Sequence, residues 1–264
     1  MSLMSRRDFR ELRVLCTGAS SGIGAALSRQ LARRGARLVL NARREERLRE
    51  LAGDIEKEGG EVCLVAGDIT EQQTRQAMLA RCQSQWGGVD AIINCAGIGS
   101  IANFTDSSED ILRQIMEVNF FAAVELTRLA IPVLQTGRQP IIVNIGSVLG
   151  HRAVPSKSEY CASKFALHGF SDALRAELAA TGIDLLLVSP STTSSEFFDH
   201  LLHQDKTSAP AGRRGMPPQK VATKIIRAMA AGRHEIIIPV GGKLLVWLDR
   251  LCPPLMNRLL ARHG

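Results

Sequence analysis

Seven short apolar runs, spread along the 264-residue chain, constrain its fold most strongly. Each run places Val, Ile and Leu side by side instead of alternating them with polar residues, and helical patterns lie between the runs. The runs cover residues 14–16, 38–40, 62–65, 91–94, 141–145, 185–188 and 235–238. Continuous apolar runs are typical of strands buried on both faces of a parallel sheet. We therefore predict a doubly wound α/β fold with about seven parallel strands and helices on both faces.

The composition predicts one domain and excludes several classes of protein. With 45% apolar and 22% charged residues, the chain can form one large core, so we assign residues 1–264 to a single domain. Residues 1–12 form an N-terminal extension without an apolar signal segment, and no apolar run has the length of a membrane span. The net charge is +7, but aromatic residues make up only 4% and no basic run is interleaved with them, so nucleic acid is not an expected partner.

The six cysteines form neither a Cys-x-x-Cys pair nor an evenly spaced framework. Reduced thiols in the cytoplasm are the default for such a pattern. We therefore expect a cytoplasmic protein without disulfides, and the sequence indicates no metal site.

A glycine-rich turn follows the first apolar run. Residues 17–24 read Thr-Gly-Ala-Ser-Ser-Gly-Ile-Gly, and a helical pattern with an apolar face follows at residues 25–32. Gly18, Gly22 and Gly24 permit a positive φ and let backbone N–H groups approach a pyrophosphate, which the positive end of the helix also favours. The arrangement of strand, glycine turn and helix is that of a Rossmann-type dinucleotide site, although a turn without a ligand can have the same composition.

Three residues have the chemistry of a proton-transfer site. Tyr160 and Lys164 are four residues apart, so a helix carries both on one face, and Ser147 lies thirteen residues before Tyr160, just after an apolar run. A phenol has a pKa of about 10, and a cation one helical turn away favours the phenolate and lowers that pKa. A serine hydroxyl beside the phenol can hold a carbonyl oxygen. A Tyr-Lys pair alone also occurs on many solvated helices, so the rest of the chain must decide.

Taken in order and with their spacing, these motifs resemble those of the short-chain dehydrogenase/reductase family. The resemblance covers nearly the whole chain and includes further motif residues at Asp68, Asn94, Asn119 and Ser189. It implies that Tyr160 is the general acid or base, that Lys164 lowers the pKa of Tyr160 and holds the nicotinamide ribose, and that Ser147 positions the substrate oxygen. Asn119 would support a water that relays protons toward Lys164.

The resemblance also implies a set of residues around the cofactor. Asp68 and Ile69 would meet the adenine, and residues 94–97 would line the floor of the site and steady the central sheet. Pro190 is followed by Ser191 where the family usually has glycine, so the local path is expected to differ. The residues expected at the cofactor are Gly18, Ser20, Ser21, Gly22, Ile23, Gly24, Arg43, Arg44, Asp68, Ile69, Asn94, Ala96, Gly97, Tyr160, Lys164, Pro190, Thr193 and Ser195.

The end of the second apolar run predicts which nicotinamide cofactor is bound. An Asp or Glu usually stands there when the cofactor has no 2′-phosphate, because the carboxylate takes the ribose hydroxyls. Here Asn41 and Ala42 occupy that place, and Arg43 and Arg44 offer guanidinium groups to a phosphate. The sequence therefore favours NADP(H) over NAD(H). Solvated arginines paired with Glu45 and Glu46 are the alternative.

Two further segments are expected to shape access to the site. Residues 192–218, with a helix over about residues 195–204 and a Pro/Gly-rich stretch after it, are predicted to form a substrate lid. Residues 243–264 are apolar with basic residues between and are interrupted by Pro253 and Pro254. This amphipathic segment either packs over the pocket or a neighbouring subunit, or it contacts a membrane surface.

Together the motifs predict an NADP(H)-dependent oxidoreductase that transfers hydride between nicotinamide and a small-molecule carbonyl compound or alcohol. A cofactor-binding regulatory or structural protein without turnover is the alternative. The complete set of Asn119, Ser147, Tyr160 and Lys164 favours the enzyme. The family resemblance also implies a homodimer or homotetramer that uses helices at residues 105–135 and 158–180.

Overall fold

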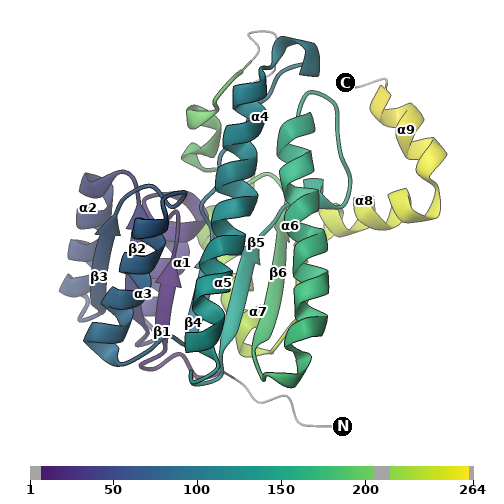
Figure 1. The fold of residues 1–264 in the computed structure, drawn as a ribbon. Helices are drawn as coiled ribbons and strands as arrows, with labels where there is room; N and C mark the ends of the chain where they lie inside the picture. The colour runs from purple at the N-terminus through teal and green to yellow at the C-terminus, as the bar shows by residue number, and fades with distance from the viewer. Residues whose placement is uncertain (1–6, 205–214, 262–264) are drawn as a thin grey trace.

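The computed structural model describes residues 7–204 and 215–261 and contains the predicted parallel sheet (Figure 1). Seven strands run parallel in the order β3-β2-β1-β4-β5-β6-β7. They are β1 Arg13–Cys16, β2 Arg37–Ala42, β3 Glu61–Ala66, β4 Ala91–Asn94, β5 Ile141–Ile145, β6 Asp184–Pro190 and β7 Glu235–Ile238. All seven predicted strands are confirmed. The order reverses between β1 and β4, and ligands of open α/β sheets bind outside the carboxyl ends of the strands at such a point.

Helices cover both faces of the sheet, as predicted. They are α1 Gly22–Ala32, α2 Glu45–Lys57, α3 Gln72–Trp86, α4 Glu109–Met116, α5 Ala122–Leu134, α6 Ser158–Glu177, α7 Pro218–Ala230, α8 Val240–Leu251 and α9 Pro253–Ala261. Alternate residues of β1 belong to two separate apolar cores. Val14 lies in the core under α1, α2 and α7, whereas Leu15 lies in the core under α3, α5 and α6. A strand buried on both faces must be apolar at every position, which explains the continuous runs.

The described part of the N-terminal extension packs against the sheet. Phe9 and Leu12 are buried in the same core as Val14. The guanidinium of Arg7 donates to Asp184 at the start of β6 at 2.6 Å and to the carbonyl of Met229 in α7 at 2.6 Å. This segment therefore ties the start of the chain to a distant strand and helix.

The predicted helix over residues 195–204 is wrong. The chain makes a short 3₁₀ helix at Glu196–His200 and then extends. The backbone N–H of Ile101 donates to the carbonyl of His203, and the N–H of Leu202 donates to the carbonyl of Gly99, both at 2.9 Å. Because these bonds pair the segment with a neighbouring loop, its backbone cannot continue as a helix. Part of the expected lid, residues 205–214, lies outside the described residues.

The C-terminal segment forms two helices, α8 and α9, at the edge of the molecule (Figure 1). The helices are separated at Cys252, in agreement with the predicted break at the prolines. Arg152 holds both helices, because its guanidinium lies 2.9 Å from Asp249 and donates to Asn257 at 2.6 Å. Among the helices of the described ranges, none combines the length and apolar character needed to cross a membrane.

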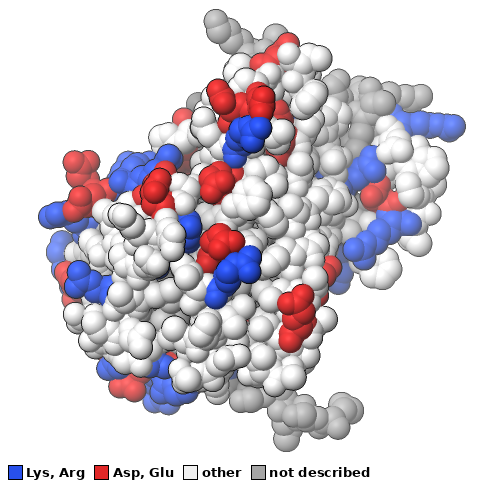
Figure 2. All heavy atoms as spheres, viewed as in Figure 1, with Lys and Arg blue, Asp and Glu red and all other residues white. Residues whose placement is uncertain are grey.

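Charged side chains are mixed on the face of the molecule seen in Figure 2. Basic and acidic groups alternate there, with uncharged surface between them. The net charge of +7 is therefore not gathered into one basic patch on this face.

Candidate active site

The glycine turn forms a close-packed cradle between β1 and α1. A Cβ on Gly18, which has a φ of +65°, would lie 2.8 Å from the backbone of Ala96. A Cβ on Gly24 would lie 2.3 Å from the carbonyl oxygen of Gly18. Ser21 precedes α1 and makes no side-chain cap, so the first N–H groups of the helix receive no bond from that hydroxyl. The turn therefore has room for a ligand only because its glycines lack a Cβ, and it lies at the N-terminus of a helix. Both properties fit the binding of a pyrophosphate.

One cavity of about 550 Å³ joins this cradle to the predicted proton-transfer residues. Its volume is within the range typical of small-molecule and cofactor sites, about 300–1,000 Å³. Of the predicted site residues, all except Asn94 and Asn119 line it. Those that do are Gly18, Ser20, Ser21, Gly22, Ile23, Gly24, Arg43, Arg44, Asp68, Ile69, Ala96, Gly97, Ser147, Tyr160, Lys164, Pro190, Thr193 and Ser195.

Tyr160 and Lys164 come from the first turns of α6, and Ser147 comes from the loop after β5. The ammonium of Lys164 lies 5.7 Å from the centre of the Tyr160 ring and donates to the carbonyl of Ile145 at 2.9 Å. The Ser147 hydroxyl accepts a bond from the N–H of Leu149 at 3.1 Å, which orients it within the loop. Ser147 and Lys164 are both buried. Tyr160 is partly exposed, and all three groups line the same cavity.

The pKa of Tyr160 differs from the expectation that Lys164 lowers it. Burial raises the pKa of Tyr160 to about 12, and the hydrogen bond from Ser147 offsets only part of this effect. Burial also lowers the pKa of Lys164 to about 8. The ammonium donates to a backbone carbonyl, and burial disfavours its charge as it disfavours the phenolate. Burial thus favours the protonated phenol, which is the form that can donate a proton.

Asn119 lies in a π-helical segment, Glu117–Phe121, between α4 and α5. Its amide nitrogen donates to the carbonyl of Ile98 and to the hydroxyl of Ser163, and its oxygen accepts from the N–H of Ile98 at 2.9 Å. A Cβ on Gly97 would lie 3.3 Å from the Asn119 oxygen and 3.8 Å from the Lys164 nitrogen. Asn119 therefore holds the loop after β4 beside Lys164. A π-bulge of this kind is frequent at functional sites.

Asn94 was expected both to line the floor of the cofactor site and to steady the central sheet, but it does not line the cavity. Its amide donates to the side chains of Asn144 on β5 at 2.8 Å and Thr127 on α5 at 3.1 Å. Asn144 in turn donates to Ser171 of α6 at 2.9 Å. This buried network connects the central strands to the helix that carries Tyr160, so Asn94 steadies the sheet as expected but does not face the cofactor site.

The other end of the cavity carries the two arginines. Asn41 is buried, and its amide donates to the carbonyls of Val65 and Gly67, so no carboxylate stands at the end of β2. Arg43 is exposed and pairs with no acidic residue in the described part of the chain. Arg44 lies 3.0 Å from the carboxylate of Glu196 and also reaches the hydroxyl of Ser20.

Ser191, Thr193 and Ser195 line the cavity on the side of β6 and the glycine turn. A Cβ on Gly22 would lie 3.3 Å from the Cβ of Ser195, so Ser195 sits directly against the glycine turn. Thr193 lines the cavity and pairs with Met216 in an isolated parallel bridge. Ser191 is not among the described residues with a positive φ, which explains why a side chain is tolerated where the family usually has glycine.

The sequence did not reveal the individual roles of two residues next to Ser195. Glu196 pairs with Arg44, and Phe197 packs against Tyr160 with ring centres 5.7 Å apart. Both were expected only as part of a lid, because their contacts depend on how the loop folds. Val148, Leu149 and Phe197 contribute apolar side chains to the lining of the cavity.

Comparisons with known proteins agree with the geometry. The family model described as short chain dehydrogenase matches residues 13–206. A Drosophila melanogaster protein, dehydrogenase/reductase SDR family protein 7-like, is 32% identical over 265 residues, with 95% of this chain and 80% of the relative covered. The chain therefore belongs to the short-chain dehydrogenase family of oxidoreductases.

Two solved structures have the same fold. A short-chain dehydrogenase/reductase from Burkholderia phymatum, in complex with NAD, has a TM-score of 0.88 at 25% identity, with 94% of this chain and 96% of that chain covered. A short chain dehydrogenase from Burkholderia cenocepacia, in complex with NADP, has a TM-score of 0.79 at 25% identity, with 90% and 100% covered. These similarities support a nicotinamide cofactor.

Proposed function

We propose that this protein is an NADP(H)-dependent oxidoreductase that interconverts a carbonyl compound and a secondary alcohol, with Tyr160 as the general acid or base. The observation that carries the proposal is the meeting of Ser147, Tyr160 and Lys164 in the same cavity as the glycine cradle. A protein that only binds a cofactor has no need for a buried phenol and ammonium beside a serine hydroxyl.

The residues divide the work of a carbonyl reduction. The bound nicotinamide supplies or accepts the hydride. The Ser147 hydroxyl donates to the substrate oxygen and positions it, and Tyr160 transfers its phenolic proton to that oxygen. Lys164 stabilises the phenolate that forms, because the ammonium is buried and its charge acts at short range. Asn119 fixes the loop that faces Lys164.

The choice of NADP(H) rests on Arg43 and on the absence of an acid at the end of β2. The structural relatives are complexes with NAD in one case and NADP in the other, so the fold is compatible with both. A carboxylate at the end of β2 would repel a 2′-phosphate, whereas an unpaired guanidinium attracts it. Arg43 is available to a phosphate without breaking an ion pair with any described residue.

The cavity wall favours an apolar carbonyl substrate. Val148, Leu149 and Phe197 line the same cavity as Tyr160, and the ring of Phe197 packs against that of Tyr160. A ketone or aldehyde with apolar groups beside the carbonyl would bury them there, while a charged group would lose its hydration without compensation. The exposed Phe121 and Phe165 lie in the helical region where the family resemblance implies a homo-oligomer, and we include such an assembly in the proposal.

The variant Tyr160→Phe tests the proposed chemistry, because it removes only the hydroxyl. We expect turnover of NADPH with a responsive ketone to fall by about two to four orders of magnitude, while calorimetry shows unchanged NADPH binding. Activity close to wild type in this variant would contradict the role of Tyr160. Tight NADPH binding by the wild type without turnover of a broad panel of ketones, aldehydes and quinones would favour the binding protein instead.

A further inference from the structure

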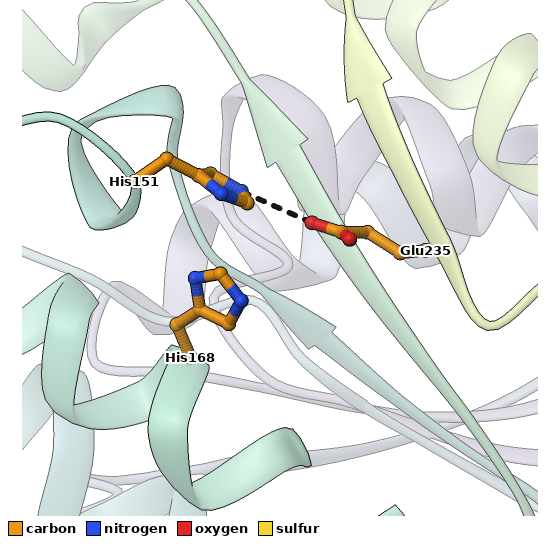
Figure 3. A group of neighbouring side chains, drawn as sticks. All are labelled: His151, His168 and Glu235. Atoms are coloured by element: carbon orange, nitrogen blue, oxygen red, sulfur yellow. Dashed lines mark ion pairs between the residues drawn. The ribbon is translucent and has the colours of Figure 1, made fainter. Parts of the chain in front are cut away.

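A second group of titratable side chains lies outside the cavity. His151 follows the 3₁₀ turn Val148–Gly150, His168 lies in α6, and Glu235 begins β7. One possible ligand atom from each of the three residues lies within 4.8 Å of the other two. Figure 3 shows the two rings and the carboxylate converging from three separate elements. None of the three residues lines the cofactor cavity, so the cluster is not explained by the proposed reaction.

His151 is held in place but has one nitrogen without a partner. Only 2% of its side chain is exposed. Its Nε2 lies 2.9 Å from the hydroxyl of Ser189 and 3.0 Å from the carboxylate of Glu235. Its Nδ1 is buried and contacts no hydrogen-bonding group of the described residues. A buried polar atom without a partner is costly, so the ring is held in this position by the contacts of its Nε2 with Ser189 and Glu235.

His168 has the hydrogen bond typical of a metal-binding histidine. Its Nδ1 lies 3.1 Å from the carbonyl oxygen of Gly150, which can only accept, so Nδ1 carries the hydrogen. This bond leaves the lone pair of Nε2 free, the usual arrangement in which a backbone carbonyl orients a metal ligand. Nε2 faces a carboxylate oxygen of Asp172 at 3.2 Å, whose other oxygen is held by Arg175 at 2.8 Å. The Asp172 carboxylate would therefore attract a cation bound at this lone pair.

We propose that His151, His168 and Glu235 bind a divalent transition-metal ion of the zinc class. Imidazole and carboxylate ligands in this combination suit Zn²⁺, and Asp172 or water can complete four-coordination. Zn²⁺ binds neutral imidazole and ionised carboxylate, so any proton carried by these ligands is released to solvent, and no change of oxidation state is needed.

The distances require a small movement that the fold permits. Ligand atoms on one tetrahedral zinc are roughly 3.4 Å apart when each bond is about 2.1 Å, so a pair at the 4.8 Å limit must approach by about 1.4 Å. His151 Nε2 and the Glu235 carboxylate are already 3.0 Å apart. The exposed fractions of the His168 and Glu235 side chains are 17% and 36%, so these two can change rotamer, whereas His151 is fixed. The ion would enter from the side of His168 and Glu235.

Metal binding would connect the loop after Ser147 to α6 and β7. The loop already lies against the catalytic helix, because a Cβ on Gly150 would be 2.7 Å from the carbonyl oxygen of Lys164. An ion held by His151 and His168 would fix this contact and raise the unfolding temperature, since it binds only the folded chain. This consequence does not depend on which cofactor or substrate the protein uses.

Calorimetric titration of the chelator-treated full-length protein with Zn²⁺ tests the proposal, with Co²⁺ absorption as a second readout. We expect one ion per chain and Co²⁺ bands typical of nitrogen and oxygen ligands, without a thiolate charge-transfer band. His168→Gln and Glu235→Gln should each weaken Zn²⁺ binding at least about tenfold. Thermal unfolding should rise with Zn²⁺ in the wild type and much less in these variants. Circular dichroism checks that both variants fold.

Two control variants separate this site from other metal-binding groups. His234→Gln changes an exposed histidine next to Glu235, and Cys252→Ser removes an exposed thiol. Both should bind Zn²⁺ as the wild type does. The proposal is overturned if the wild type shows no saturable Zn²⁺ binding, which would mean that only protons occupy the cluster. It is also overturned if binding survives in both His168→Gln and Glu235→Gln, or disappears in Cys252→Ser.

Discussion

Replacing Arg43 with alanine should separate binding of the two nicotinamide cofactors. Arg43 is exposed at the end of β2 and pairs with no acidic residue of the described chain, whereas Arg44 is engaged by Glu196 at 3.0 Å. If a 2′-phosphate binds at this end of the cavity, Arg43 is the cation that can meet it without losing a partner. NADH has no phosphate there, so its binding should not depend on Arg43.

The magnitude follows from the kind of contact and its exposure. Hydrogen bonds to charged groups contribute about 1.5–3 kcal/mol. Because Arg43 is exposed, we take the lower end, about 1.5 kcal/mol, which is roughly a tenfold weaker Kd for NADPH. The Arg44–Glu196 pair has side chains 37% and 40% exposed, so it contributes about 0–1 kcal/mol. Glu196→Gln should therefore tighten NADPH binding by at most about fivefold, since the phosphate no longer competes with a carboxylate.

Calorimetric titration of each variant with NADPH and with NADH measures both effects. Arg49→Ala is the matched control. It also removes one positive charge, but from within α2, where Arg49 pairs with Glu45. Equal losses for NADPH and NADH in Arg43→Ala would refute phosphate recognition by this residue. So would a loss in Arg49→Ala as large as that in Arg43→Ala, which would indicate only a general effect of positive charge.

Two further predictions concern backbone packing and proton linkage. Gly24→Ala should abolish cofactor binding and lower the unfolding temperature, because its Cβ would lie 2.3 Å from a carbonyl oxygen. Gly53 lies in α2 and has open space around the position of a Cβ, so Gly53→Ala should stabilise the protein by roughly 0.5–1 kcal/mol. Both are measured by thermal unfolding and NADPH titration, and similar behaviour of the two variants would contradict the cradle. Burial lowers the pKa of Lys164 from 10.5 to about 8, so between these values the unfolded chain binds more protons and the free energy of unfolding rises with pH. Denaturant unfolding from pH 7 to 9.5 measures this effect in the wild type and in Lys164→Met. Above pH 8 the free energy of unfolding of the wild type should rise relative to that of Lys164→Met by about 1.4 kcal/mol per pH unit. Parallel pH dependence of the two proteins would argue against the lowered pKa of Lys164.

Much of the fold could be predicted because burial on both faces leaves a direct trace in the sequence. A strand such as β1 must supply Val14 to one core and Leu15 to the other, so the alternation seen in half-exposed strands disappears. The glycine turn was equally clear, since the spacing of its glycines reflects approaches too close for any Cβ. These features depend on local sequence, which is why the chain alone could reveal them.

Contacts between distant segments could not be predicted in this way. Arg44 and Glu196 are 152 residues apart, and nothing in either neighbourhood indicates the pair. The helix expected over residues 195–204 is replaced by a segment paired with the loop at Gly99, which local propensity cannot anticipate. Likewise, the pKa of Tyr160 depends on how deeply the phenol is buried, and the spacing to Lys164 alone suggested the opposite direction.

The segment from Ser147 to Arg152 connects the cavity, α6, the cluster of His151, His168 and Glu235, and the C-terminal helices. Ser147 faces the cavity, Gly150 lies against the helix of Lys164, His151 belongs to the histidine cluster, and Arg152 holds α8 and α9. A displacement of any of these contacts would move the backbone next to Ser147, the residue that we propose positions the substrate oxygen. We therefore expect reactivity to respond to Gly150, His151 and Arg152, which do not line the cavity but share one short loop with Ser147.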